Sequence, residues 1–189
     1  MKLKKLVAIT LSTVMCMAAL TGCGGKSDSA KKTAKVIEVD LTDEQYAFGV
    51  DKDQPDLLKE VNQFVSDMKS DGTFDEICNR YFGDGTPVPV QSAAYDESKD
   101  QLVVATNAAF EPFEYMDGEN YVGIDMEIAK ALADKLGKEL VIQNMDFDAV
   151  CLSVGQHKCD IAMAGLTIKP DREEYVAFSD PYYSASQKL

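Results

Sequence analysis

The sequence predicts an α/β fold in which a sheet carries helices on both faces. Between residues 101 and 178, short apolar runs of strand length alternate with segments of helical periodicity. Apolar residues form 46% of the 189-residue chain and charged residues 27%, which is typical of a globular protein. The formal net charge of −13 argues against a nucleic-acid-binding protein, because such proteins need basic surface to replace phosphate counterions.

The first 22 residues have the features of a signal peptide. Three lysines lie among the first five residues, and residues 6–20 carry no charge over a length that suits a signal-peptide core. The following run, Leu20-Thr21-Gly22-Cys23, resembles the bacterial lipobox, which is cleaved before the cysteine and lipidated on its sulfur. An ordinary secretory signal or a fortuitous cysteine is the alternative. We expect a lipid on Cys23 and, because residues 24–35 are small, polar and lysine-bearing, a flexible tether over residues 23–45.

The next part of the chain predicts two short strands, two helices and a linker. The first helix opens with Pro55 in its first turn and ends at Asp71-Gly72, and its apolar residues repeat with a helical period. Thr73 and Glu76 have the spacing of a capping box that starts a second helix ending at Gly83. The expected strands are residues 36–40 and 46–50, and the linker is residues 84–99.

The second half predicts the regular alternation. Expected strands are 101–106, 140–142, 161–165 and a stretch from Ala177, and expected helices are 124–136, 147–154 and a helix or turn at 171–176, with a loop at 107–118. In such sheets ligands bind at the carboxyl ends of strands, and the loops there are residues 107–115 and 165–172.

Cysteine and histidine give few options for chemistry. Beyond Cys23 the chain has Cys78, Cys151 and Cys159, so at most one internal disulfide can form. The nearest pair is Cys151 and Cys159, and buried free thiols are an equal alternative. The single histidine, His157, lies in a polar turn, where a surface position is favoured over a metal site. We expect no metal and no cofactor.

The loop at residues 165–172 has the chemistry to bind a carboxylate. Gly165 allows close approach to the backbone, and Thr167 offers a hydroxyl and an amide. Arg172 is one of only two arginines, and its planar guanidinium matches a carboxylate with two parallel hydrogen bonds. The alternative is a surface ion pair of Arg172 with Glu173 or Asp180.

Residues 97–189 resemble the first lobe of the polar amino-acid-binding proteins of ABC transporters. The stretches that carry the resemblance are VVATNAAFEPFEY, YVGIDMEIAKALADKLG, NMDFDAV and CDIAMAGLTIKPDREEYVAFSDPYY. The resemblance implies a type II periplasmic-binding-protein lobe, with a mixed sheet and helices on both faces. It also implies an amino-acid ligand, no catalytic residue, and ligand-binding roles for six residues: Asn107, Phe110, Phe147, Gly165, Thr167 and Arg172.

The resemblance gives each of these residues a role. Two aromatic rings, at Phe110 and Phe147, stack on the ligand. The carbonyl of Gly165 binds its ammonium group, while Thr167 and Arg172 bind its carboxylate. Asn107 matches a position that selects the ligand side chain and is often Asp in the family, so the preferred amino acid stays open.

Residues 46–83 resemble the segment that normally ends the chain in the same family. The order is therefore expected to be circularly permuted, with one lobe formed by residues 46–189 and the second lobe absent. The expected parts are a signal peptide at 1–22, a tether at 23–45, the permuted piece at 46–83, a linker at 84–99, and the first part of the lobe at 100–189.

The function that this resemblance implies is an extracytoplasmic lipoprotein that captures a polar amino acid for an ABC permease. Its expected location is the outer face of the bacterial cytoplasmic membrane, to which the lipid on Cys23 anchors it, or the periplasm. Three alternatives stay open. One is a sensor domain of the same fold, another is a structural or adhesive lipoprotein. The third is a dehydratase-like enzyme, for which Glu114 is the candidate carboxylate.

Overall fold

The computed structural model describes residues 41–186. The expected signal peptide, the expected lipidation site at Cys23, the expected strand at 36–40 and most of the expected tether lie outside the described residues. Within residues 41–186, no helix combines the length and apolar character needed to cross a membrane.

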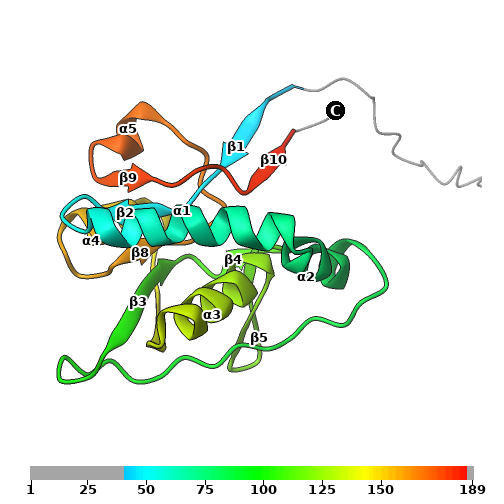
Figure 1. Cartoon of the computed structure of the whole chain (residues 1–189), viewed down its shortest axis with the longest axis horizontal. Helices are drawn as coiled ribbons and strands as arrows, with labels where there is room; N and C mark the ends of the chain where they lie inside the picture. The colour runs from blue at the N-terminus through cyan, green and yellow to red at the C-terminus, as the bar shows by residue number, and fades with distance from the viewer. Residues whose placement is uncertain (1–40, 187–189) are drawn as a thin grey trace, which may run out of the picture. The chain divides into compact units, whose positions relative to one another are not determined.

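A five-stranded sheet forms the centre of the described part (Figure 1). Its order is β7 (Glu139–Asn144), β3 (Gln101–Thr106), β8 (Ile161–Ala162), β2 (Gly49–Asp51) and β9 (Val176–Phe178). β3 is parallel to both β7 and β8, whereas β2 is antiparallel to both of its neighbours. The sheet is therefore mixed, as the resemblance implied.

β2 comes from the early part of the chain and lies between two late strands. Gly49 pairs with Ala162 of β8 on one side and with Phe178 of β9 on the other. Next in the chain are α1 (Pro55–Ser70) and α2 (Thr73–Phe82). The two segments on either side of residues 84–99 therefore build one sheet together.

The start of α2 differs from the expected capping box. Thr73 is the first helical residue, and the N-cap is Gly72, whose φ of 87° suits glycine. The Asp71 carboxylate accepts a hydrogen bond from the Thr73 backbone N–H at 2.9 Å. A capping-box threonine must precede the helix, so the expectation for Thr73 is wrong by one position.

Helices cover both faces of the sheet. On one face, Leu102 and Val104 of β3 pack in a core with buried residues of α1, α2 and α3 (Ile124–Leu136). On the other face, Val103 and Ala105 pack in a second core with α4 (Phe147–Gly155). Successive side chains of a strand point to opposite faces, which explains this division. The expected arrangement of helices on both faces is confirmed.

The expected loop at 107–118 is a small three-stranded sheet instead. It contains β4 (Ala109–Phe110), β5 (Glu114–Asp117) and β6 (Asn120–Val122). The expected buried strand at 161–165 keeps ladder pairing only over Ile161–Ala162. The helix expected near 171–176 is α5 (Pro170–Glu173).

A two-stranded ribbon stands beside the central sheet (Figure 1). It pairs β1 (Glu44–Tyr46) with β10 (Tyr183–Ala185) in antiparallel register. Glu44 and Gln45, which the sequence analysis assigned to the tether, are thus part of the folded unit. Among the described residues, the linker at 84–99 has no strand longer than one bridge, between Val90 and Tyr121.

The three described cysteines, Cys78, Cys151 and Cys159, are free thiols. Cys151 and Cys159 are buried in the core beneath α4, and Cys78 is half-buried. Of the two alternatives left by the sequence, the structure favours small buried thiols.

Candidate functional site

A hollow of about 320 Å³ lies at the turn that follows β8. Five of the six residues expected to bind a ligand line it. The lining residues are Glu44, Tyr46, Phe110, Phe147, Ala164, Gly165, Thr167, Lys169 and Arg172.

Hydrogen bonds from two directions fix the turn at residues 165–167. Gly165, with a φ of 52°, donates its backbone N–H to Oδ2 of Asp125 at 2.9 Å. On the other side, the Ala47 N–H donates to the Leu166 carbonyl at 3.0 Å and the Ile168 N–H to the Gln45 carbonyl at 3.1 Å. The turn is therefore held in place before any ligand arrives.

Arg172 is directed into the hollow by its own neighbours. Its Nη1 donates a hydrogen bond to the Thr167 carbonyl at 2.9 Å. Its Cζ atom lies 5.0 Å from the centre of the Phe147 ring, a cation–π distance. The Thr167 contact uses one of the five N–H donors of a guanidinium, so the group is oriented for an anionic partner. The alternative ion pairs with Glu173 or Asp180 are not among the contacts of the described residues.

The two aromatic rings are unusually exposed for phenylalanine. The exposed fractions of Phe110 and Phe147 are 43% and 41%. The Phe110 ring stacks on the buried Phe113 with 5.4 Å between ring centres. A methyl group added to Gly165 would lie 2.9 Å from Cε1 of Phe110, so this ring covers the turn closely. Two exposed rings beside a guanidinium suit a ligand with both apolar and anionic parts.

Asn107 lies outside this arrangement. Its side-chain Nδ2 donates to the Met145 carbonyl at 2.7 Å, and Asn107 is not among the residues that line the hollow. The expected side-chain-selecting position is therefore occupied by a structural hydrogen bond between the ends of β3 and β7.

Glu44 is the lining residue that sequence reasoning missed. Its Oε2 accepts a hydrogen bond from Oγ1 of Thr167 at 3.1 Å. Burial, followed by the nearby Glu44 carboxylate, raises the pKa of Tyr46 to about 12. Nothing local marks Glu44, because its place depends on strand pairing with residue 185, far along the chain.

The acids of the α3 first turn do more than complement the helix dipole. Asp125 is fully buried, and its Oδ1 accepts a hydrogen bond from the Tyr182 hydroxyl at 2.6 Å. Glu127 binds Arg80 at 2.5 Å and the Tyr81 hydroxyl at 2.7 Å, which ties α3 to α2. Both acids therefore make specific contacts that join α3 to other parts of the fold.

Glu114 does not reach the hollow. Its side chain is completely buried, and neither carboxylate oxygen has a hydrogen-bond partner among the described residues. Burial, followed by the negative charge of Asp125, raises the pKa of Glu114 far above its usual range. A carboxylate shut away in this manner cannot act on a ligand, so the candidate acid of the enzyme alternative is lost.

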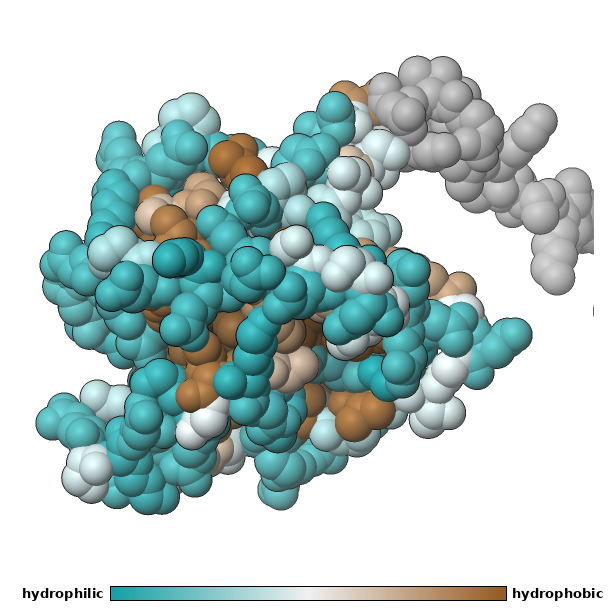
Figure 2. Space-filling model, viewed as in Figure 1, coloured by the Kyte–Doolittle hydropathy of each residue, from teal (hydrophilic) through white to brown (hydrophobic). Residues whose placement is uncertain are grey.

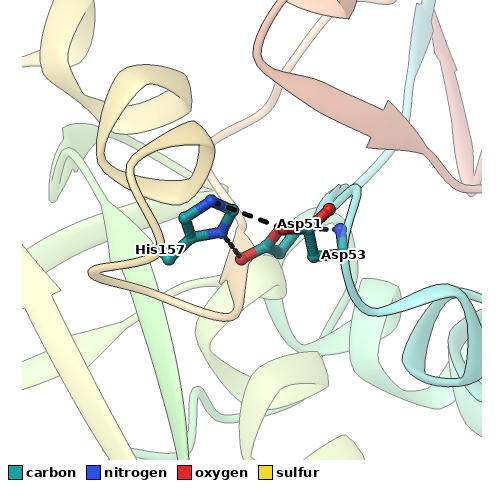
Figure 3. Close-up of side chains that lie close together, drawn as sticks. All are labelled: Asp51, Asp53 and His157. Atoms are coloured by element: carbon teal, nitrogen blue, oxygen red, sulfur yellow. Dashed lines mark hydrogen bonds and ion pairs between the residues drawn. The ribbon is translucent and has the colours of Figure 1, made fainter.

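His157 forms an ion pair on a different part of the surface (Figure 3). Its Nδ1 lies 2.7 Å from Oδ2 of the buried Asp51, and its Nε2 lies 3.6 Å from Oδ2 of Asp53. The three groups are close enough to hold a metal ion. The hydrogen bond to Asp51 already accounts for their arrangement as a link between the turn after α4 and the end of β2.

A larger hollow, of about 440 Å³, lies between α2, α3 and residues 88–91. Its charged lining includes Arg80 and Glu127, which are bound to each other. Figure 2 shows hydrophilic side chains over most of the face on which α1 lies, in keeping with the net charge of −13. Because Arg80 and Glu127 in the larger hollow already bind each other, the hollow after β8 is the better candidate site.

An α/β lobe built on a central mixed sheet, with a polar hollow that is lined by aromatic rings at the end of a strand, is the structure of a small-molecule-binding domain. Residues 7–84 and 102–189 match the bacterial extracellular solute-binding proteins, family 3. The chain belongs to this family.

Individual relatives match about half of the chain. The arginine-binding extracellular protein ArtP of Bacillus subtilis is 40% identical over 94 residues, 50% of this chain and 37% of that protein. Cyclohexadienyl dehydratase of Pseudomonas aeruginosa is 35% identical over 82 residues, 43% of this chain and 31% of that protein. This chain thus spans about a third of the length of either relative.

Among solved structures, the arginine-bound form of truncated ArgBP from T. maritima is 44% identical. The match covers 44% of this chain and 40% of that one, with a TM-score of 0.43.

Proposed function

We propose that this protein binds a free polar amino acid outside the cytoplasm and delivers it to an ABC permease. The observation that carries the proposal is the shared hollow of Phe110, Phe147, Gly165, Thr167 and Arg172. It offers donors for a carboxylate, acceptors for an ammonium group and exposed rings for the ligand side chain. Two of the relatives are arginine-binding proteins by name, which makes arginine the first ligand to test.

We propose a lipid anchor on Cys23, supported by the charged start, apolar run and small residues that precede it. Incorporation of labelled palmitate into the wild-type protein, and its loss in Cys23→Ala, is the expected result. Equal labelling of both proteins contradicts the anchor.

We also propose that residues 46–83 take the place of the segment that ends the chain in other family members. One finding supports this order: β2, from the early segment, pairs between β8 and β9 of the later segment.

Calorimetric titration with the twenty amino acids tests the binding function. We expect arginine to bind and Arg172→Ala to weaken binding at least about tenfold, the size of a charge-assisted hydrogen bond. Arg172→Lys keeps the charge but loses the planar fork, so its affinity is expected to lie between the two.

The matched control is Lys59→Gln on the exposed side of α1, which removes one positive charge away from the hollow. It should bind as the wild type does. Unchanged affinity in Arg172→Ala, or no binding of any amino acid by the wild type, contradicts the proposed function.

A further inference from the structure

We propose that Glu44 binds the α-ammonium group of the ligand and so restricts the site to amino acids with a free amino group. The inference rests on the proposed function, since it assigns a role within the same hollow. Glu44 belongs to β1, a strand that the sequence placed in the tether.

The first argument is the position of the carboxylate. Glu44 is half-buried and lines the hollow together with Gly165 and Arg172. Its Oε2 lies 3.1 Å from Oγ1 of Thr167, so it stands at the same turn that offers hydrogen bonds to a ligand. Partial burial strengthens the attraction of such a carboxylate for a cation compared with full exposure to water.

The second argument is the arrangement of charges around Thr167. The Arg172 guanidinium donates to the carbonyl of Thr167 at 2.9 Å, while the Glu44 carboxylate accepts from its hydroxyl. A positive and a negative group thus flank a single residue. The two charges of a free amino acid are attached to one carbon atom, so they are separated by a similarly short distance. The pair therefore fits the head of a zwitterion, with the carboxylate at Arg172 and the ammonium at Glu44.

The third argument is rigidity. Glu44 and the residue after it are anchored, because β1 pairs with β10 from Glu44 onward and the Gln45 carbonyl accepts a hydrogen bond from the Ile168 N–H at 3.1 Å. Glu44 and Thr167 are therefore carried by the same hydrogen-bonded backbone. A group fixed before binding loses little conformational entropy when the ligand arrives.

Among the charged side chains that line the hollow, Glu44 is the acidic one. Lys169 and Arg172 are the other charged side chains that line the hollow, and both are cationic. An ammonium group is repelled by these two and attracted by Glu44. Backbone and hydroxyl oxygens of the turn complete its hydrogen bonds but carry no charge.

The test compares two ligands that differ only in the α-amino group. They are arginine and 5-guanidinopentanoate, which has the same carboxylate and guanidinium but no ammonium. Affinities of the purified chain are measured by calorimetry for the wild type, Glu44→Gln and the control Asp43→Asn. Asp43 is exposed and is not among the residues that line the hollow.

We expect Glu44→Gln to lower the affinity for arginine by about five- to tenfold, the range for a half-exposed charged hydrogen bond, and to leave the affinity for 5-guanidinopentanoate unchanged. Asp43→Asn should change neither affinity. Unchanged arginine affinity in Glu44→Gln overturns the inference. An equal loss for both ligands also overturns it, because Glu44 then acts on the guanidinium or on the fold.

The proposed function can fail separately. If the wild type binds no amino acid, both proposals fall. If the wild type binds arginine and Arg172→Ala does not, while Glu44→Gln binds as the wild type does, the Glu44 assignment alone is wrong.

Discussion

The carboxylate of Asp125 and the backbone N–H of Gly165 are joined by a hydrogen bond of 2.9 Å. This bond ties the first turn of α3 to the turn at the candidate site. The second oxygen of Asp125 accepts from the Tyr182 hydroxyl at 2.6 Å, just before β10. One buried carboxylate therefore positions the binding turn from beneath without lining the hollow.

Asp125→Asn should weaken ligand binding because an amide has only one oxygen to accept the two hydrogen bonds. We expect a loss of about 1–3 kcal/mol in the free energy of unfolding, as for a buried hydrogen bond to a charged group. We expect arginine affinity to fall as well, measured by calorimetry at a temperature where the variant is folded.

Tyr182→Phe separates positioning from stability. It removes the other hydrogen bond of Asp125 and leaves the Gly165 bond in place. This variant should lose stability in urea unfolding but keep most of its affinity. If both variants bind arginine as the wild type does, Asp125 has no positioning role.

Gly165→Ala should lower both stability and affinity. The φ of 52° is costly for alanine, by about 1 kcal/mol, and the new methyl group would lie 2.9 Å from Cε1 of Phe110. The Phe110 ring must move to make room, and it borders the hollow. Thermal unfolding and calorimetry measure the two effects.

Gly118→Ala is the matched control. Gly118 has a similar φ of 62°, but a methyl group there meets nothing within 4 Å. The control should show only the loss of stability that comes from its positive φ, with unchanged affinity. Equal affinities in the two variants would mean that the Phe110 ring does not contribute to binding.

The sequence predicted the elements whose signals are local. The helical repeat and the terminal Gly137 predict α3. The apolar run Leu102-Val103-Val104-Ala105 predicts β3, whose six residues are all buried in the structure. The hairpin of β4 and β5 was missed because β4 is only two residues long and carries no alternating pattern. The strand predicted at 161–165 is shorter in the structure, where β8 covers only Ile161–Ala162. A buried apolar run does not by itself ensure pairing with a neighbouring strand.

The residues of the candidate site were likewise predictable only where their signals are local. Gly165, Thr167 and Arg172 lie within one short segment and could be chosen from their chemistry. Glu44 reaches the hollow only through its pairing with Ala185, and Asp125 reaches Gly165 from another helix. Such contacts are fixed by the tertiary fold, and no property of the neighbouring sequence signals them.

Glu114→Gln should raise stability at neutral pH. Burial raises the pKa of Glu114, so the folded chain holds a proton there that the unfolded chain releases above a pKa of about 4.3. Folding then requires proton uptake, and stability falls as pH rises above that value. We expect the variant to gain about 1–3 kcal/mol at pH 8 and progressively less toward pH 5, measured by urea unfolding.

Glu97→Gln serves as the control, because Glu97 is exposed in the linker. Its stability should differ little from that of the wild type at every pH. A Glu114→Gln variant whose advantage does not grow with pH contradicts a protonated Glu114.

His157 should titrate above its ordinary value because Asp51 stabilises the imidazolium. The hydrogen bond from Nδ1 to the buried Asp51 carboxylate is the main cause, and it raises the pKa of His157 (Figure 3). The chain has one histidine, so its ring resonances in a proton NMR titration report this pKa directly. Asp51→Asn should return the pKa toward about 6.5.

The sign of the effect on stability follows from this shift. A pKa raised on folding stabilises the protein below the unfolded value of about 6.5, and the contribution is lost as pH rises through the folded value. The difference in melting temperature between the wild type and His157→Asn should therefore be larger at pH 6 than at pH 8. Asp53→Asn should move the histidine pKa less than Asp51→Asn, because Asp53 is exposed and lies 3.6 Å from Nε2. A melting difference that is constant from pH 6 to pH 8 contradicts an ion pair at this position.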